Sequence, residues 1–198
     1  MAELVFDIET QNANFGFDSA GLKAARISVV GVYDYSDGQY KTYMEETLND
    51  LFAIMEKADR LITYNGIHFD IPVLNNYYTG DLSKILQCDM IVHVKKVLGF
   101  RLKLNDLAKA TLKEEKTADG LQAVKWWEEG KIEEIKKYCL QDVKVTKDLY
   151  EFGKKNKQLF YFNLQGEILP FPVNFDPPAT ATAGAAQQGS NINLTLPF

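Results

Sequence analysis

The segment LVFDIET, Leu4–Thr10, joins a short apolar run to two acidic residues. Leu4–Phe6 is typical of a buried β-strand. Asp7 and Glu9 are two residues apart, and alternate side chains of a strand share a face, so both carboxylates are expected on the same side of a sheet. An Asp-x-Glu pair at a strand end is common by itself. Its meaning depends on what the rest of the sequence brings to it.

Runs of β-branched and aromatic residues predict further strands. These strands are Arg26–Tyr35, Gln39–Tyr43, Arg60–Tyr64, a short Leu86–Cys88, and a closing hairpin of Leu159–Phe162 with Ile168–Val173. Asp37-Gly38 is a hairpin signal between the first two of them.

Helices are predicted by capping signals and by apolar residues at helical spacing. Thr47 with Asp50 resembles a capping box that opens a helix through Met55 and Ala58. Asp70 precedes a helix with Pro72 in its first turn. Later helices are predicted at Met90–Leu98, Leu104–Leu112, Leu121–Glu129 and Lys131–Lys155. The order of elements predicts an α/β fold, a mixed sheet flanked by helices.

Further acidic residues lie on separate predicted elements. Tyr138 precedes Asp142 by four residues, which stacks the two on one face of a helix. Converging carboxylates repel one another unless cations hold them, and oxygen ligands suit Mg²⁺ or Mn²⁺. Two plainer alternatives stand beside this interpretation. Asp70 could be a helix N-cap, and Tyr138 and Asp142 could belong to an ordinary amphipathic face.

Bulk composition sets the class of protein. The chain has 198 residues, a net charge of −5 and a pI of about 5.1. An acidic chain argues against nucleic-acid binding, unless several carboxylates share one site and divalent cations neutralise them. The start of the sequence has no secretory signal pattern, and Cys88 and Cys139 have no disulfide or metal-ligand spacing. We therefore expect a cytoplasmic protein.

Three segments carry a family resemblance. FDIET at Phe6–Thr10, NGIHFDIPVL at Asn65–Leu74 and YCLQD at Tyr138–Asp142 resemble the exonuclease motifs of the DEDD superfamily. Tyrosine four residues before the last aspartate marks its DEDDy branch, which is DnaQ-like. The chain looks similar, over roughly residues 4–150, to stand-alone exonucleases related to the exonuclease domain of family-B DNA polymerases. The resemblance implies an RNase-H-like fold.

The resemblance also implies a function, a metal-dependent 3′→5′ exonuclease that releases nucleoside 5′-monophosphates from single-stranded DNA. Its cofactors would be two divalent ions, Mg²⁺ or Mn²⁺. Asp7, Glu9 and Asp142 would hold the ion that activates water, and Asp7 would also bridge to the second ion. Asp70 would support that second ion, and Tyr138 would orient the attacking water.

Other residues of the matching motifs are expected to contact the substrate. Asn65 would position the terminal nucleotide, Phe69 would offer a stacking face, and Ile8 and Thr10 would contact its sugar or base. Core packing is the alternative for Ile8 and Phe69. His68 is expected at the surface or behind the site, and Asp89 is expected in a turn or cap.

Two basic groups are interpreted as solvated helix faces, with contact to a phosphate backbone as the alternative. They are Lys95, Lys96, Arg101, Lys103 and Lys109, and Lys154, Lys155 and Lys157. Of the adjacent Trp126 and Trp127, at most one is expected to stack on a base, and the other is expected in the core.

Three regions are predicted, an exonuclease domain at 1–175, a flexible linker at 176–190 and a peptide at 191–198. NLTLPF, at the end of the sequence, resembles the bacterial sliding-clamp-binding motif, although Asn193 stands where glutamine is usual. Leu194, Leu196 and Phe198 would anchor it in a hydrophobic groove. The alternatives for the peptide are an edge strand or a disordered end.

Two rival functions remain open from the sequence. The same acids and fold would serve a 3′→5′ exoribonuclease, because the contact that reads a 2′-hydroxyl is not visible in these motifs. The other rival is a non-catalytic module that binds nucleic acid or a clamp.

Overall fold

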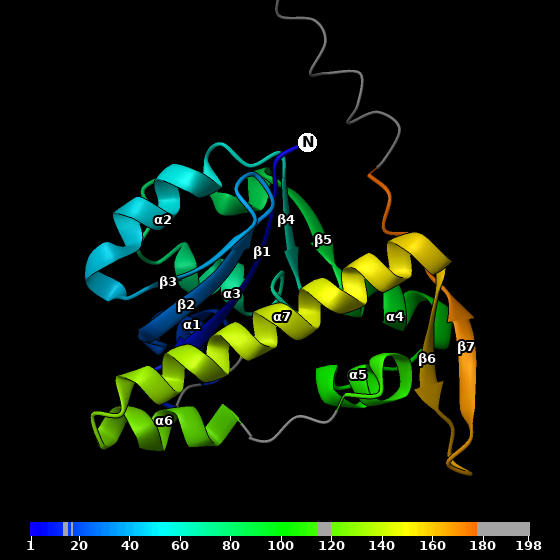
Figure 1. Cartoon of the computed structure of the whole chain (residues 1–198). Helices are drawn as coiled ribbons and strands as arrows, with labels where there is room; N and C mark the ends of the chain where they lie inside the picture. Colours follow the sequence, from blue (N-terminus) through cyan, green and yellow to red (C-terminus); the bar gives the residue numbers. More distant parts are fainter. Residues whose placement is uncertain (14–15, 17, 115–119, 178–198) are drawn as a thin grey trace, which may run out of the picture.

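A computed structural model describes residues 1–13, 16, 18–114 and 120–177. Within these residues the centre of the molecule is a five-stranded sheet (Figure 1) with the strand order β3-β2-β1-β4-β5. The strands are β1 Glu3–Thr10, β2 Ile27–Asp34, β3 Gln39–Tyr43, β4 Arg60–Thr63 and β5 Leu86–Asp89. β1 is therefore the central strand.

The sheet is mixed. β1 pairs antiparallel with β2 and parallel with β4, and β5 runs parallel to β4. The carboxyl ends of β1, β4 and β5 consequently meet at one edge of the sheet, the edge where open α/β proteins commonly bind ligands. β4 pairs only with Glu3–Val5 of β1, so the later residues of β1 extend past β4.

One face of the sheet is covered by short helices. They are α1 Ser19–Ala24, α2 Leu48–Met55 and α3 Asp70–Leu74, with single 3₁₀ turns η1 Glu45–Thr47 and η2 Leu82–Lys84. Leu4, Phe6 and Ile8 of β1 point into this layer and form one apolar cluster with side chains of all three helices. Their alternation with Val5, Asp7 and Glu9 follows from the two-residue period of a strand.

The opposite face is crossed by the long helix α7, Ile132–Asn156, which runs obliquely over β1 and β2 (Figure 1). Val143, Leu149 and Tyr150 of α7 join Val5 and Ile62 of the sheet in a second apolar cluster. The cluster also includes residues of α4 Met90–Leu98, α5 Leu104–Leu112 and the hairpin of β6 Gln158–Phe162 and β7 Ile168–Pro172. α6, Gly120–Glu128, packs beside the first half of α7 (Figure 1).

Gly31 of β2 lets α7 approach the sheet closely. A Cβ atom at this position would lie 2.9 Å from Cys139 Sγ and 3.1 Å from Val143 Cγ2. Such distances are too short for a side chain, so glycine is required there. Gly31 is the cross-strand partner of Asp7, and this close approach of α7 therefore occurs beside Asp7.

The architecture confirms the predicted mixed sheet with helices on its faces. The bounds predicted for β3, α4 and α5 agree with the structure. α1 was not predicted, because its six residues are too few to show helical periodicity. The capping box at Thr47 was wrong. The Thr47 hydroxyl instead accepts the Met44 N–H at 2.9 Å within η1, and no side chain caps α2 there.

The predicted flexible linker, 176–190, lies outside the described residues apart from its first two positions, and so does the predicted peptide 191–198. The peptide includes the expected clamp contacts Asn193, Leu194, Leu196 and Phe198. In the part of the chain that the structure describes, no helix combines the length and the apolar composition needed to cross a membrane.

Candidate active site

Asp7 and Glu9 lie on β1 and face the layer of α7. Asp7 is half-buried and Glu9 is 8% exposed. Ile8 between them points the other way into the apolar core, which confirms the shared face predicted for the two carboxylates. One oxygen from each carboxylate and the Sγ of Cys139 lie within 4.8 Å of one another.

Tyr138, Cys139 and Asp142 bring α7 to this pair. All three are buried, and they lie on the turns of α7 that pass over β1 and β2. The Cys139 thiol is held by two backbone groups, since it accepts the Gly31 N–H at 3.1 Å and donates to the Asp7 carbonyl at 3.4 Å. α7 is therefore fastened to the sheet at the residue that carries the first carboxylate.

The electrostatics of the thiol are dominated by its burial and by the nearby acids. Burial raises the pKa of Cys139 well above its ordinary value, and the negative charges of Asp7, Glu9 and Asp142 raise it further. A neutral thiol is a poor metal ligand. The donors that remain at this place are carboxylate oxygens, which suit hard divalent cations. Asp7 and Glu9 thus form an acidic group fit to hold a metal ion.

Asp70 contacts β1 on the side of β4. β4 ends at Thr63, in a register that leaves Ile8 without a strand partner on that side, and the Ile8 N–H donates to Asp70 Oδ1 at 3.2 Å. The carboxylate therefore lies beside the residue that separates Asp7 from Glu9. Burial raises the pKa of Asp70 to about 7, with a further contribution from the negative charge of Asp89. Phe69, not Asp70, occupies the N-cap of α3, so the plain capping alternative does not hold.

Asp89 has a larger structural role than the sequence suggested. It caps α4 by accepting the Ile91 N–H at 3.2 Å, as expected for a cap. It also accepts the N–H groups of Asn65 at 2.7 Å and Ile67 at 3.1 Å. These bonds hold the loop that leads to Asp70, in which Asn65 has a left-handed backbone with φ 77°. Burial of Asp89 raises its pKa. From the sequence, the position of Asp89 between a strand and a helix predicted only a turn or cap.

The four candidate substrate residues are in different environments. Ile8 is buried in the apolar core and Phe69 packs against the same cluster. The hydroxyl of Thr10, which is buried, donates to the Asn12 carbonyl at 2.8 Å. Asn65 is half-buried, and its side-chain oxygen accepts a hydrogen bond from Arg101. Asn65 therefore differs from the other three residues in that its side chain binds a cation, Arg101, from a distant segment.

His68 is exposed, as expected.

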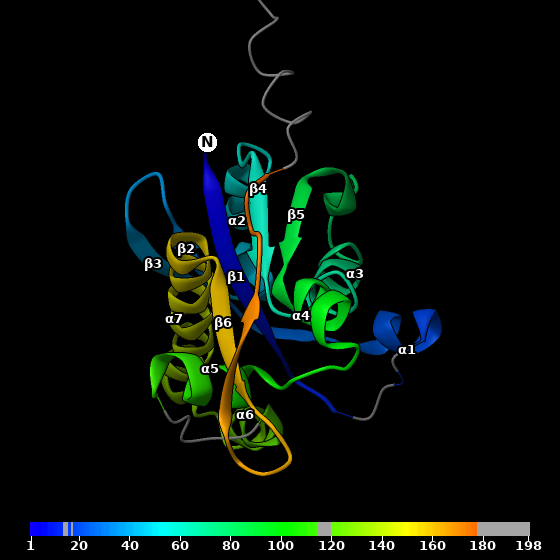
Figure 2. The same cartoon turned by 90° about the vertical axis from the view of Figure 1, so that its right-hand side faces the viewer.

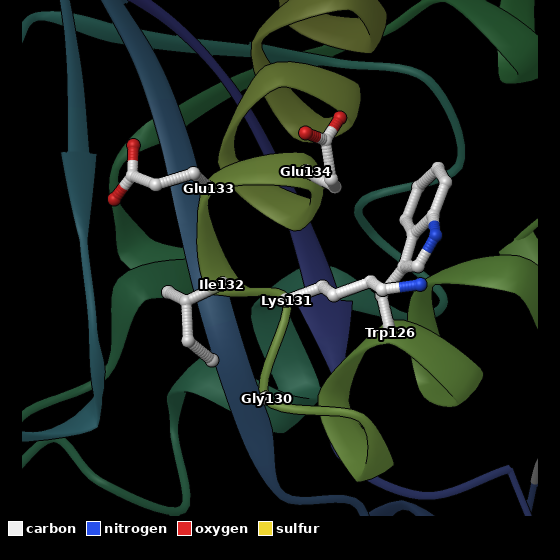
Figure 3. A pocket seen from close by; sticks show the side chains of 6 residues that line it. All are labelled: Trp126, Gly130, Lys131, Ile132, Glu133 and Glu134. Atoms are coloured by element: carbon white, nitrogen blue, oxygen red, sulfur yellow. The ribbon is translucent and has the colours of Figure 1, made fainter.

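Trp126 and Trp127 are both half-buried and pack against the cluster that contains Tyr138 and Cys139. The rings of Trp126 and Tyr138 meet edge to face, with centroids 6.0 Å apart. Figure 3 shows the cavity beside Trp126, about 540 Å³ in volume. It is lined by Trp126, Gly130, Lys131, Ile132, Glu133 and Glu134. Trp126 thus contacts both this cavity and the Tyr138 ring.

Comparisons with known proteins agree with this geometry. The sequence profile of the RNase_H superfamily matches residues 4–152. The fold is similar to that of the family B DNA polymerase from the hyperthermophilic archaeon Pyrobaculum calidifontis, with a TM-score of 0.61 and 17% sequence identity. The likeness covers 77% of this chain and 24% of the polymerase chain, so it concerns a part of that enzyme. A comparison with curated proteins gives no match. Because the profile matches most of the chain, the chain belongs to the RNase_H superfamily.

Proposed function

We propose that the protein is a metal-dependent 3′→5′ exonuclease that releases nucleoside 5′-monophosphates from single-stranded DNA. One observation carries the proposal. Carboxylate oxygens of Asp7 and Glu9 lie within 4.8 Å of the Cys139 sulfur, the charge of Asp142 on the same helix also acts on this thiol, and Asp70 accepts the amide N–H of Ile8 between the first two acids. Acidic side chains distant in sequence thus gather where β1 extends past β4. Such a cluster is stable in a folded protein when cations neutralise it.

The residues fit two divalent cations, Mg²⁺ or Mn²⁺. Asp7, Glu9 and Asp142 would hold one, and Asp7 would share the second with Asp70. When bound, the cations would supply neutralisation of the phosphodiester charge and a lowered pKa of water. The raised pKa of Asp70 agrees with this assignment, because burial opposes its charge until a cation arrives.

The chain itself supplies orientation. Tyr138 lies one residue before Cys139, and the Trp126 ring packs against it edge to face, which supports the position of the tyrosine ring. Its hydroxyl would orient the water that attacks the terminal phosphodiester in line with the leaving 3′-oxygen. Attack on phosphorus breaks the bond to that oxygen, which takes up a proton, and a 5′-monophosphate leaves.

The test is hydrolysis of 5′-labelled single-stranded DNA and RNA of matched sequence, with Mg²⁺, with Mn²⁺ or with EDTA. We expect a ladder that shortens from the 3′ end, is lost in EDTA, and is lost in Asp7→Asn. Asp50→Asn, an exposed acid on α2, is the matched control and should keep full activity. Cleavage that persists in EDTA would overturn the proposal.

The same assay separates the two alternatives. Faster shortening of RNA than of DNA would favour an exoribonuclease. Binding of both strands without shortening in either cation would favour a non-catalytic module.

We also propose that the peptide at 191–198 recruits the protein to a bacterial sliding clamp. Support comes from the sequence NLTLPF alone. Tethering to a clamp would raise the effective concentration of the exonuclease at DNA ends, and this favours DNA as the substrate.

A further inference from the structure

The linker between α4 and α5, residues 99–103, is fastened to the loop that follows β4. The Tyr64 hydroxyl donates to the Leu102 carbonyl at 2.8 Å, and the Arg101 guanidinium donates to the side-chain oxygen of Asn65. Tyr64 and Asn65 are the first two residues after β4. The linker is thereby held at the sheet edge that carries the acidic cluster, and Figure 2 shows it passing from α4 across to α5.

This linker exposes the side chains that single-stranded nucleic acid requires. Phe100 is 47% exposed, so nearly half of its surface is open to a base, and its ring is supported by an edge-to-face contact with Tyr161, with centroids 6.0 Å apart. Arg101 and Lys103 on either side of Leu102 are exposed. An aromatic face next to cations is the combination by which proteins bind single strands without reading sequence.

Charge at the linker has the opposite sign to that of the whole chain. Residues 90–105 contain Lys95, Lys96, Arg101 and Lys103 and no Asp or Glu, whereas the net charge is −5. A guanidinium carries five N–H donors, so the bond to Asn65 orients Arg101 and leaves donors for a phosphate. A phosphodiester chain is the partner that this local positive charge complements.

We propose that the α4–α5 linker binds the strand on the 5′ side of the scissile bond, with Phe100 stacked on a base and Arg101 and Lys103 on phosphates. This inference rests on the proposed function, because it takes the acidic cluster as the place where the 3′ end is cut. It revises the interpretation of Arg101 and Lys103 as part of a solvated face. The substrate is then a single strand of several nucleotides, not a free dinucleotide.

The test measures binding of a fluorescent single-stranded oligonucleotide by anisotropy over a series of salt concentrations. All variants carry Asp7→Asn, so that the strand is not degraded during the titration. Phe100→Ala is expected to weaken binding about tenfold without changing the salt dependence, because it removes a neutral stacking contact. Arg101→Gln with Lys103→Gln is expected to reduce the slope of log affinity against log salt by about 1.4, two phosphate contacts on a single strand.

The glutamine at position 101 can still donate to Asn65, so the linker stays fastened in that variant. Lys57→Gln is the matched control. It is an exposed lysine just before β4, at the opposite edge of the sheet, and should leave both affinity and slope unchanged. An unchanged affinity and slope in all linker variants would overturn the inference. The exposed α4–α5 linker would then be a surface for a different partner.

A second measurement separates this inference from the proposed function. With Asp7 intact, the KM of the wild type should fall as the oligonucleotide is lengthened from two to about six nucleotides, and in the linker variants this fall should flatten. A KM that depends on length equally in wild type and variants would contradict the linker, with exonuclease activity intact. Absence of hydrolysis in every variant would contradict the proposed function, while the anisotropy data would still report on the linker.

Discussion

At the scale of single residues, the site depends on the absence of a side chain at Gly31. Gly31 faces Cys139 so closely that a Cβ there would lie 2.9 Å from the sulfur. Its amide is also the donor that holds the thiol. The distance between Asp7 of β1 and the residues of α7 is therefore set at a glycine, whose backbone amide binds the thiol and which has no side chain.

Gly31→Ala should lower both stability and hydrolysis. The added methyl group must displace α7 or distort β2, and overpacking of this kind costs about 1–3 kcal/mol. Chemical denaturation and the initial rate on a 5′-labelled strand measure the two effects. Adding Cys139→Ala to Gly31→Ala should recover part of the loss, because the sulfur that the new Cβ meets is removed. Equal stability of Gly31→Ala and wild type would contradict the close approach.

Asp70 should make the metal-free protein less stable as pH rises. Its pKa is raised to about 7 in the folded chain from an ordinary 3.8, so between these values the folded chain keeps a proton that the unfolded chain has lost. The unfolded state then binds fewer protons, and the free energy of unfolding falls by a few kcal/mol as pH rises through this window. Urea melts in EDTA should show this fall in wild type and a weaker fall in Asp70→Asn. Parallel pH profiles for the two proteins would contradict it.

The positions of the acids Asp7, Glu9 and Asp142, and of Tyr138 beside them, could be predicted from the sequence, since these residues occupy local motifs with regular spacing. The bonds of Asp89 to the amides of Asn65 and Ile67 could not. They join segments more than twenty residues apart, and they exist because β4 and β5 end side by side at the same edge. Local periodicity carries no information on such contacts.

At the scale of elements, the two halves of α7 have different structural roles. Its first half carries Tyr138, Cys139 and Asp142, and its second half packs Tyr150 against a buried ion pair at the far end of the sheet. There the Arg60 guanidinium donates to the Phe175 carbonyl at 2.6 Å and lies 3.6 Å from a Glu3 carboxylate oxygen. The Tyr150 hydroxyl donates to Glu3 at 2.6 Å. These bonds fix the far end of the helix that carries Tyr138 and Asp142.

Arg60→Leu should destabilise the fold by about 3 kcal/mol, because it removes the buried guanidinium partner of the Glu3 carboxylate and leaves it paired with the more exposed Lys154, 3.5 Å away. Adding Glu3→Gln should restore part of the loss, since the poorly compensated buried charge is then gone. Arg26→Leu is the matched control. It breaks an exposed pair with Glu45 and should change the urea midpoint much less. A control variant as destabilised as Arg60→Leu would count against a buried network.

Most helices and strands were predictable because they are long or strongly patterned. α4 and α5 show apolar residues at helical spacing over nine residues each, and β3 follows an Asp-Gly turn. α1 escaped prediction because six residues, two of them alanine and one glycine, carry no periodic signal. The Thr47 capping box failed because η1 intervenes and turns the hydroxyl back to Met44. Short elements depend on tertiary packing more than on their own sequence.

At the scale of the whole molecule, acidic and basic groups are separated along the sequence yet meet at one edge of the sheet. The acidic cluster gathers where β1 extends past β4, and the basic α4–α5 linker is fastened to the residues that follow β4. A net charge of −5 therefore does not describe the local field at the site. Composition alone would have argued against a nucleic-acid substrate.

The proposed clamp peptide should act independently of this edge. Deleting residues 193–198 should abolish capture by an immobilised bacterial sliding clamp and leave the rate on short free oligonucleotides unchanged, because tethering affects only effective concentration. Replacing Leu196 and Phe198 with alanine should act as the deletion does. Undiminished capture by the shortened chain would remove the clamp from the account.

Asp7 and Glu9 of β1, Asp70 of α3 and Asp142 of α7 are proposed to bind a pair of divalent cations together. Anomalous diffraction from crystals soaked in Mn²⁺ with a nucleoside 5′-monophosphate tests this claim most directly. We predict two manganese peaks about 3.5–4 Å apart, one of them within about 2.5 Å of oxygens of both Asp7 and Asp142. Saturating Mn²⁺ with no anomalous peak beside Asp7 would contradict the claim.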